Sequence, residues 1–167
     1  AIGAGIGLKL PWWNFTNLYG TVRYGFSDQT VTGRLGVIRN GPGWKLTVDG
    51  AVAAPRTLAW ADLEAFEQVD DVSDFHCVTK WSRMNMRWRG VRLADVLAAA
   101  EPRPTARFVM CHAYDGYTTN LPLADISTDE AIVAYAYEGE PIEPIHGGPV
   151  RIVVPHLYFW KSAKWVR

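Results

Sequence analysis

Alternating apolar and polar positions predict a chain that is richer in strands than in helices. Residues 44–50 alternate in this way and end in Asp-Gly, which is typical of a strand followed by a turn. Apolar and β-branched residues predict further strands over 74–81, 131–137 and 149–155, and the turn residues inside 107–123 predict a hairpin. We expect these strands to form most of the folded body.

Two segments have the spacing of short helices. Residues 57–68 carry acidic residues early in the segment, and residues 91–100 repeat apolar side chains at helical intervals before Pro102. Residues 82–90 are polar and are predicted to form a loop. Strands and helices together predict an α+β fold, with mixed strand-rich sheets and short helices.

The first part of the chain differs from the remainder. Residues 1–43 are rich in glycine and aromatic residues without helical periodicity, so we expect an irregular N-terminal arm there. Residues 44–167 are expected to form one domain, which suits a chain of 167 residues. Because KWVR directly follows an apolar, aromatic run, we expect this domain to be truncated at its C terminus.

Composition narrows the classes of function. The chain is 49% apolar, has a formal net charge of zero and contains two cysteines, which indicates a globular protein without a disulfide framework. Free thiols are the simpler expectation, and a bridge between Cys77 and Cys111 is the alternative. No broad basic face indicates a nucleic-acid partner, and no apolar run reaches the length of a membrane span. We expect a monomer in the cytoplasm, or in the periplasm if a signal sequence has been removed.

The stretch DFHCVTKWS places Cys77 beside His76. A free cysteine in a strand is most often a small buried hydrophobic residue. Fixed positive charge nearby favours a thiolate instead, and a thiolate attacks electrophiles or binds metals. No Cys-x-x-Cys, His-x-x-x-His or His-Glu-x-x-His spacing exists, so a zinc site made only by protein ligands is not indicated. Five cations follow the cysteine before any acid: Lys80, Arg83, Arg87, Arg89 and Arg92.

Two later blocks could bind an anionic ligand. In HGGPVR, two glycines allow close approach to the backbone between His146 and Arg151, although a plain turn would look the same. In KSAKW, two lysines and a hydroxyl favour a phosphate site, with a solvated basic turn as the alternative. The block lacks the Gly-rich pattern of a P-loop, so nucleotide hydrolysis is not indicated.

The order of these blocks resembles a known family. DFHCVTKWS with the following WRGV, then DGYTTNLPL, then HGGPVRIVVPHLYFWKSAKW resemble the sulfite-oxidase-type molybdopterin-binding oxidoreductases over about residues 44–167. The similarity is to the small bacterial sulfite-oxidase-like enzymes and to the catalytic subunit of the protein-methionine-sulfoxide reductase. It implies the fold of that family and a molybdenum–molybdopterin cofactor.

The resemblance also implies roles for the conspicuous residues. Cys77 would be the protein's thiolate ligand to molybdenum, with the remaining ligands supplied by the pterin dithiolene and oxo groups. His146 and Arg151 would contact the pterin. A polar residue at the end of the strand after the helix also touches the cofactor in the family, and by spacing we expect His112 there, with Asp115 as the neighbouring option. The segment expected to hold the pterin phosphate comprises Ser162, Ala163 and Lys164, with Lys161 as an additional partner.

By the same resemblance, the protein would be an enzyme that transfers an oxygen atom in a two-electron reaction. Its substrate would be a small molecule, either a sulfoxide or N-oxide that is reduced or an oxyanion that is oxidised. Docking is expected near Trp81, Arg83 or Arg87, and an electron-transfer partner is required. The catalytic tyrosine segment of true sulfite oxidases is not found, which argues against sulfite as the substrate.

Two other classes of function are open from the sequence. The first is an enzyme that uses Cys77 as a nucleophile, with His76 or His112 as the base. Adjacent residues on one strand point to opposite faces, so His76 is poorly placed for this role. The second is a binding or assembly module that keeps the fold without the cofactor.

Overall fold

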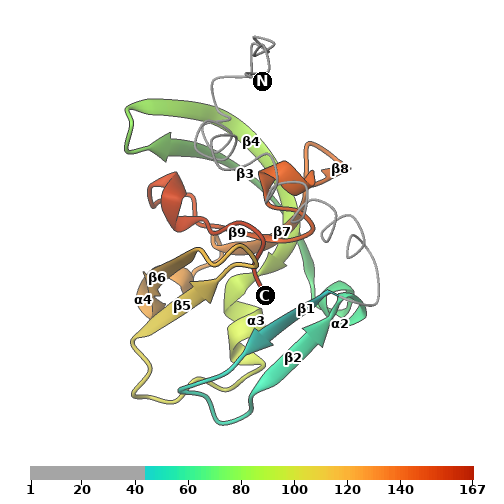
Figure 1. Ribbon diagram of the computed structural model, residues 1–167, viewed down its shortest axis with the longest axis vertical. Helices are drawn as coiled ribbons and strands as arrows, with labels where there is room; N and C mark the ends of the chain where they lie inside the picture. The colour runs from blue at the N-terminus through green and yellow to red at the C-terminus, as the bar shows by residue number, and fades with distance from the viewer. Residues whose placement is uncertain (1–43) are drawn as a thin grey trace, which may run out of the picture.

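The computed structural model describes residues 44–167, so the arm predicted over 1–43 lies outside the described residues. The described part combines short helices with antiparallel sheets (Figure 1), which confirms the predicted α+β class. Its helices are α2 (Trp60–Ala65), α3 (Leu93–Ala98) and α4 (Leu123–Ile126), with 3₁₀ turns η1 (Pro144–His146) and η2 (Phe159–Lys161). Its strands are β1 (Lys45–Val48), β2 (Arg56–Ala59), β3 (Gln68–Cys77), β4 (Trp81–Arg92), β5 (Phe108–His112), β6 (Thr118–Pro122), β7 (Ile132–Tyr137), β8 (Glu140–Pro141) and β9 (Arg151–Val153).

A five-stranded antiparallel sheet organises the described residues, in the order β3-β4-β7-β8 with β9 also paired to β7. On the edge of β7 that faces away from β4, the first residues of β7 pair with β9 and the last residues pair with β8. The β3–β4 hairpin extends beyond the other strands, and the separate hairpins β1–β2 and β5–β6 lie on the other side of the molecule (Figure 1). The long hairpin therefore has its free end away from the main body.

The loop predicted over 82–90 is wrong, because these residues lie inside strand β4. They pair with β3, and from Trp88 onward β4 also pairs with β7. Met86 and Trp88 are buried while Arg87 and Arg89 are exposed, so this part of the segment does alternate. The charged residues suggested a loop, but partner strands on both sides satisfy the backbone hydrogen bonds.

The helix predicted over 57–68 is partly wrong. Arg56–Ala59 form β2 and pair with β1, which places Leu58 opposite Leu46, and only Trp60–Ala65 are helical. The Asp62 carboxylate accepts a hydrogen bond from the Ala59 amide at 2.7 Å, which satisfies one free N–H at the helix start. The predicted hairpin over 107–123 is confirmed as β5–β6, and the second predicted helix is confirmed as α3 with shorter bounds.

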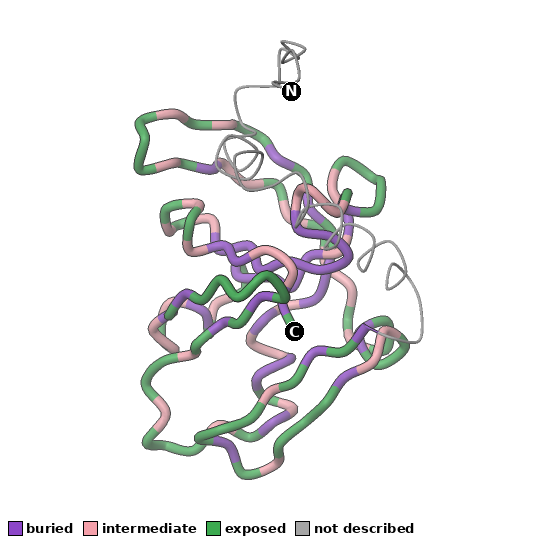
Figure 2. Tube along the Cα trace, in the orientation of Figure 1, coloured by how far each residue is buried: buried purple, intermediate pink, exposed green. Residues whose placement is uncertain are grey.

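The core has two clusters on opposite sides of β7. Val133 belongs to the larger cluster, which joins α3 to the β1–β2 and β5–β6 hairpins. Ile132 and Ala134 belong to the smaller cluster, which includes Phe75 and Trp88 from the long hairpin. Figure 2 shows buried residues concentrated along the inner strands, while the free end of the β3–β4 hairpin is mostly exposed or half-buried.

Gly90, the glycine of WRGV, allows β4 and β7 to lie close together. A Cβ atom at this position would lie 2.2 Å from the carbonyl oxygen of Val133, a contact that no side chain can make. The β4–β7 register shifts at this point, between Arg89 and Gly90. The glycine is therefore required by strand packing and not by a turn.

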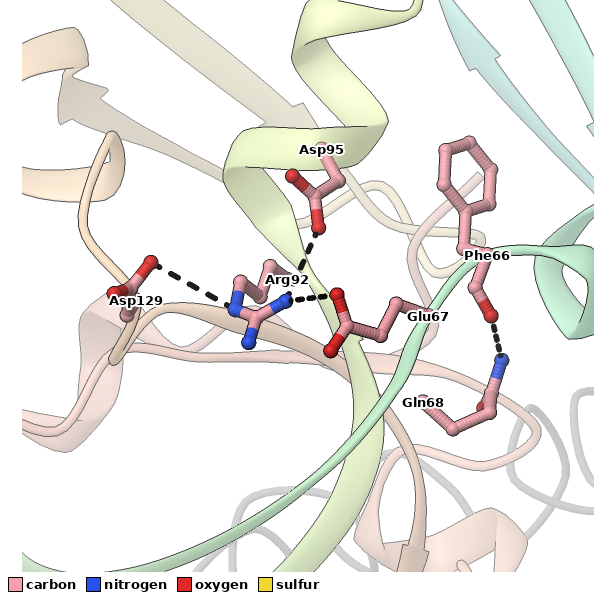
Figure 3. Close-up of polar contacts among 6 residues, drawn as sticks. All are labelled: Phe66, Glu67, Gln68, Arg92, Asp95 and Asp129. Carbon is pink, nitrogen blue, oxygen red and sulfur yellow. Dashed lines mark hydrogen bonds and ion pairs between the residues drawn. The ribbon is translucent and has the colours of Figure 1, made fainter.

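Arg92 connects the end of β4 to three neighbouring segments (Figure 3). Its Nη1 lies 2.9 Å from Oε2 of Glu67 and 3.6 Å from Oδ2 of Asp95, and its Nε lies 3.7 Å from Oδ1 of Asp129. The network joins the residue before β3, the first turn of α3 and the loop after α4. It holds the base of the long hairpin at the end opposite to Cys77.

Candidate functional site

Cys77 is the last residue of β3 and lies directly before a tight turn. It pairs with Trp81, the first residue of β4, and the Lys80 amide donates a hydrogen bond to the Cys77 carbonyl at 3.0 Å. Lys80 has a φ of 64°, the left-handed conformation that commonly closes a three-residue hairpin loop. The thiol is free and half-buried, so the turn presents it at the exposed end of the hairpin.

The second cysteine, Cys111, has a different environment. It is also free, which confirms the expectation of two free thiols over a disulfide. Burial raises the pKa of its thiol to about 11, so it stays protonated at neutral pH and behaves as a core residue. Of the two cysteines, Cys77 is the more exposed.

A groove of about 920 Å³ opens beside Cys77. One wall comes from the β3–β4 hairpin and includes Trp81, and the other comes from 155–158 with His156 and Tyr158. This volume lies in the range of small-molecule and cofactor sites. His76 also lines the groove, but its Nδ1 lies 2.7 Å from the Ser82 hydroxyl across the hairpin.

Arg151 forms a buried cationic centre below the hairpin. Its guanidinium donates to the carbonyls of His146 at 2.8 Å and Ser162 at 3.0 Å, and it stacks on the rings of Trp88 and Phe159. Burial lowers its pKa to about 9, which leaves the charge in place at neutral pH. Its Nε is buried without a hydrogen-bond partner among the described residues, so one donor is left over for a ligand or water.

The two glycines of HGGPVR are required by close packing. Gly147 has a φ of 107°, and a Cβ atom there would lie 3.0 Å from the Lys164 side chain. A Cβ atom on Gly148 would lie 1.9 Å from the carbonyl oxygen of Ile142. Gly147 therefore lets the backbone pass close to the side chains of both Arg151 and Lys164, which a turn residue with a Cβ atom would prevent.

Lys164 adds a second buried cation. Its ammonium donates to the Ile145 carbonyl at 3.0 Å, and burial, followed by the neighbouring charge of Arg151, lowers its pKa to about 7. The carboxylate of Asp115 acts in the opposite direction on this pKa. The preceding residue, Tyr114, donates its amide to the Trp165 carbonyl at 2.9 Å, so the chain at Asp115, the neighbouring option in the sequence, runs beside the residue that follows Lys164.

His146 is held in its neutral form. Burial, followed by the charges of Lys164, Arg151 and Arg83, lowers its pKa to about 4. Its Nε2 also lies 3.8 Å from the carboxylate of Glu143, which would favour protonation. Glu143 is well exposed and screened by water, so burial and the cations determine the protonation state.

Ser162 and Ala163 lie inside the protein. The Ser162 hydroxyl accepts a hydrogen bond from the Val154 amide at 3.1 Å, and Ala163 belongs to the larger core cluster. Lys161 is tied to β6, since its ammonium lies 2.6 Å from the Asn120 carbonyl and 2.7 Å from the Asn120 side-chain oxygen. Within this segment, Ser162 contacts the buried cationic centre directly, because its carbonyl accepts the hydrogen bond from Arg151, and the phosphate roles stay predictions.

His112 lies in another part of the structure. It is exposed at the end of β5 and lines a second cavity of about 360 Å³ together with Arg167, whose amide donates to the His112 carbonyl. The groove beside Cys77 has neither residue in its lining. The cofactor contact expected from His112, with Asp115 as the neighbouring option, stays a prediction.

The residues expected near the substrate are spread along β4. Trp81 lines the groove, whereas Arg83 stacks over the ring of Tyr137 at 5.5 Å from its centroid. The Arg87 amide donates to the Glu138 carboxylate at 3.4 Å. Of the three, Trp81 is the one that the structure places in the lining of the groove.

Phe159 connects the two halves of the site and was missed by sequence reasoning. Its ring packs edge-on against Phe75 at 4.7 Å and Trp81 at 6.2 Å, while the Arg151 guanidinium lies 4.6 Å from its centroid. The ring thus joins the hairpin that carries Cys77 to the buried cation of β9. Its position two residues before Lys161 was the only signal, and aromatic residues are common throughout this chain.

These residues fit a metal that brings its own chelate. Within residues 44–167, no group of three or more His, Cys, Asp or Glu side chains could hold a metal ion. The Cys77 thiol beside a large groove, together with the cations Arg151 and Lys164, suits an anionic organic cofactor with a single protein ligand. Neither cation lines that groove, and the link between Arg151 and the hairpin runs through the Phe159 ring. No helix in the described part of the chain is long and apolar enough to cross a membrane.

Comparison with known proteins identifies the family. The model of the oxidoreductase molybdopterin binding domain matches residues 35–167. The chain belongs to this family. The match agrees with the resemblance in the sequence motifs, and it establishes the chain as a molybdopterin-binding oxidoreductase domain of the sulfite-oxidase type.

Curated relatives come from several bacteria. An uncharacterised oxidoreductase, YuiH of Bacillus subtilis, is 48% identical over 74% of this chain and 63% of its own length. The catalytic subunits MsrP of the protein-methionine-sulfoxide reductases of Campylobacter jejuni and Ralstonia nicotianae are 28% and 29% identical, over 75% and 77% of this chain and 48% and 43% of their own lengths. The chain thus spans between 43% and 63% of these relatives.

A solved structure shares the fold. The sulfane dehydrogenase SoxCD from Paracoccus pantotrophus superposes with a TM-score of 0.68 at 23% identity, covering 75% of this chain and 37% of that one. The similarity confirms the predicted sulfite-oxidase-type architecture.

Proposed function

We propose that this domain binds a molybdenum–molybdopterin cofactor through Cys77 and transfers an oxygen atom to or from a small substrate. The observation that carries the proposal is the half-buried Cys77 thiol, held on a tight turn beside a groove of about 920 Å³. A nucleophilic cysteine enzyme would require a base bonded to the sulfur, but the hydrogen bond recorded at the Cys77 Sγ comes from the Thr79 hydroxyl and not from a histidine, and His112 lines another cavity.

The protein's own residues would bind and orient the cofactor. Cys77 would supply one sulfur ligand, while Arg151 and Lys164 would offset the negative charge of the pterin and its phosphate. When bound, the cofactor would supply the oxygen-atom-transfer chemistry and the accompanying change of metal oxidation state. The neutral imidazole of His146 can donate or accept one hydrogen bond without adding charge.

The reaction balance requires a second partner. Reduction of a sulfoxide consumes two electrons and two protons and releases the sulfide and water. Oxidation of an oxyanion runs in the opposite sense and releases two electrons. In either direction an electron-transfer partner must reach the cofactor. Cys77 ends β3 at the free end of the long hairpin, which is mostly exposed or half-buried (Figure 2).

Replacement of the proposed ligand tests the assignment. In Cys77→Ser, we expect oxygen-atom-transfer activity to be lost while the fold is kept, because a hydroxyl is a poor substitute for a thiolate ligand. The pterin chelate would still hold the metal, so elemental analysis of freshly purified protein checks that the variant is loaded, and circular dichroism checks the fold. The matched control is Cys111→Ala, which removes the other sulfur and should keep both molybdenum and activity. Full activity in Cys77→Ser would refute the proposal.

A further inference from the structure

The side chain of Thr79 turns back onto the sulfur of Cys77. Its Oγ1 donates a hydrogen bond to Sγ at 3.0 Å, across two residues of the same turn. Within residues 44–167, the Cys77 sulfur accepts this hydrogen bond from the Thr79 hydroxyl. If the metal takes one sulfur ligand from the protein, a hydrogen bond donated to that sulfur changes the electron density that the ligand gives to the metal.

The turn holds the hydroxyl in this position. Cys77 and Trp81 close the hairpin as paired residues, and the hydrogen bond from the Lys80 amide to the Cys77 carbonyl completes the turn. Lys80 adopts the left-handed conformation, which fixes the path of the chain directly after Thr79. Threonine is β-branched and has few side-chain rotamers, so little further entropy is lost in forming this contact.

We propose that Thr79 is a positioning residue that tunes the metal bound by Cys77, through the hydrogen bond from its hydroxyl to the ligand sulfur. The inference rests on the proposed function of Cys77. A donor on a metal-bound thiolate withdraws electron density from the sulfur, and such hydrogen bonds set the potentials of copper–thiolate and iron–sulfur centres. The reduced metal carries more electron density, so this bond stabilises it and raises the reduction potential.

Three variants separate the hydroxyl from the shape of the turn. Thr79→Val keeps the branched shape and removes the donor, whereas Thr79→Ser keeps the donor and removes the methyl group. Thr118→Val makes the same chemical change at an exposed position of β6 and is the control. Each protein is purified with cofactor, and its molybdenum content and melting temperature are measured first.

The decisive readout is the midpoint potential of the metal, followed by the Mo(V) electron paramagnetic resonance signal during a redox titration. In Thr79→Val we expect a lower potential and a shifted Mo(V) spectrum. At the wild-type midpoint, the oxidised-to-reduced ratio should change by about tenfold, which equals about 59 mV for a one-electron couple. Thr79→Ser should restore the wild-type potential, and Thr118→Val should not change it.

The outcomes distinguish this inference from the proposed function. Molybdenum-replete Thr79→Val with an unchanged potential and spectrum would overturn the role of Thr79 and leave Cys77 as the ligand. Equal shifts in Thr79→Val and Thr79→Ser would also overturn it, because the effect would then follow the turn and not the hydroxyl. Loss of molybdenum from the valine variant alone would overturn tuning as the role of Thr79, because the hydroxyl would then act in retention of the metal. Wild-type protein without molybdenum would overturn both.

Discussion

Two buried cations at positions 151 and 164 show how individual residues acquire their properties from burial. The sequence marks both as basic, but only their surroundings lower the pKa of Arg151 to about 9 and that of Lys164 to about 7. Ser162 adds that a hydroxyl can serve both needs, since it accepts a hydrogen bond from the Val154 amide and keeps its O–H as a donor. The basic residues in the sequence thus indicated a positively charged site, and packing determined which of their hydrogen-bonding groups are still available to a ligand.

Lys164 predicts a pH dependence for the cofactor-free protein. Its pKa falls from the usual 10.5 to about 7 on folding, so above pH 7 the unfolded chain holds a proton that the folded chain has released. The free energy of unfolding should therefore rise with pH, by up to about 1.4 kcal/mol per unit. Urea denaturation from pH 7 to 8.5, below the pKa of Arg151, measures this slope.

Lys164→Met provides the matched control for that slope. It removes the titrating group while keeping an unbranched side chain of similar length. The slope in the variant should be smaller than in the wild type by the contribution of Lys164. Identical slopes in the two proteins would contradict a neutral Lys164 in the folded state above pH 7.

At the level of elements, the β3–β4 hairpin determines where the thiol lies. β3 and β4 were both predicted incompletely, because the charged side chains of 82–90 obscured a strand that is stabilised by two neighbours. The turn between them contains Lys80 at a φ of 64°, and Asn85 lies farther along at a φ of 55°. The left-handed region is costly for lysine and less so for asparagine.

Lys80→Gly tests whether this strain exists. Relief of the left-handed conformation, less the added entropy of glycine in the unfolded chain, should raise the free energy of unfolding by about 0.5–1 kcal/mol. Asn85→Gly is the control and should gain less, because asparagine already tolerates this region. Both values come from denaturant melts of cofactor-free protein. Destabilisation by Lys80→Gly would show that the lysine side chain itself holds the turn.

On the scale of the whole molecule, the site is assembled from segments far apart in the sequence. The hairpin of 68–92 and the segment of 146–165 meet at the ring of Phe159, which contacts Phe75, Trp81 and Arg151. In the sheet, β7 lies between β4 and β9, and both segments contribute residues to the smaller core cluster. The relative position of Cys77 and Arg151 therefore depends on aromatic packing.

Phe159→Ala should weaken this connection. We expect the free energy of unfolding to fall by about 2 kcal/mol, below the cost for a fully buried phenylalanine because Phe159 is only half-buried. Molybdenum content should fall as well, since the hairpin is no longer held against Arg151. Phe108→Ala is the control, because that ring is 64% exposed and its removal should change stability by no more than about 0.5 kcal/mol.

Thermal melts and elemental analysis on the two phenylalanine variants measure both effects. Equal losses of stability in Phe159→Ala and Phe108→Ala would contradict a special role for the Phe159 ring. Normal molybdenum in a destabilised Phe159→Ala would show that the ring contributes to folding and not to the geometry of the site.

The sequence alone determined the family, the α+β class and the β5–β6 hairpin, and it singled out Cys77 as the candidate metal ligand. These conclusions depend on local patterns and on the order of short motifs. Only the tertiary structure decided that 82–90 is a strand, that His112 lines a cavity separate from the groove beside Cys77, and that Thr79 contacts the Cys77 sulfur. The physical reason is that strand pairing, burial and side-chain direction depend on partners distant in the chain or on the exact path of a turn, and composition records neither.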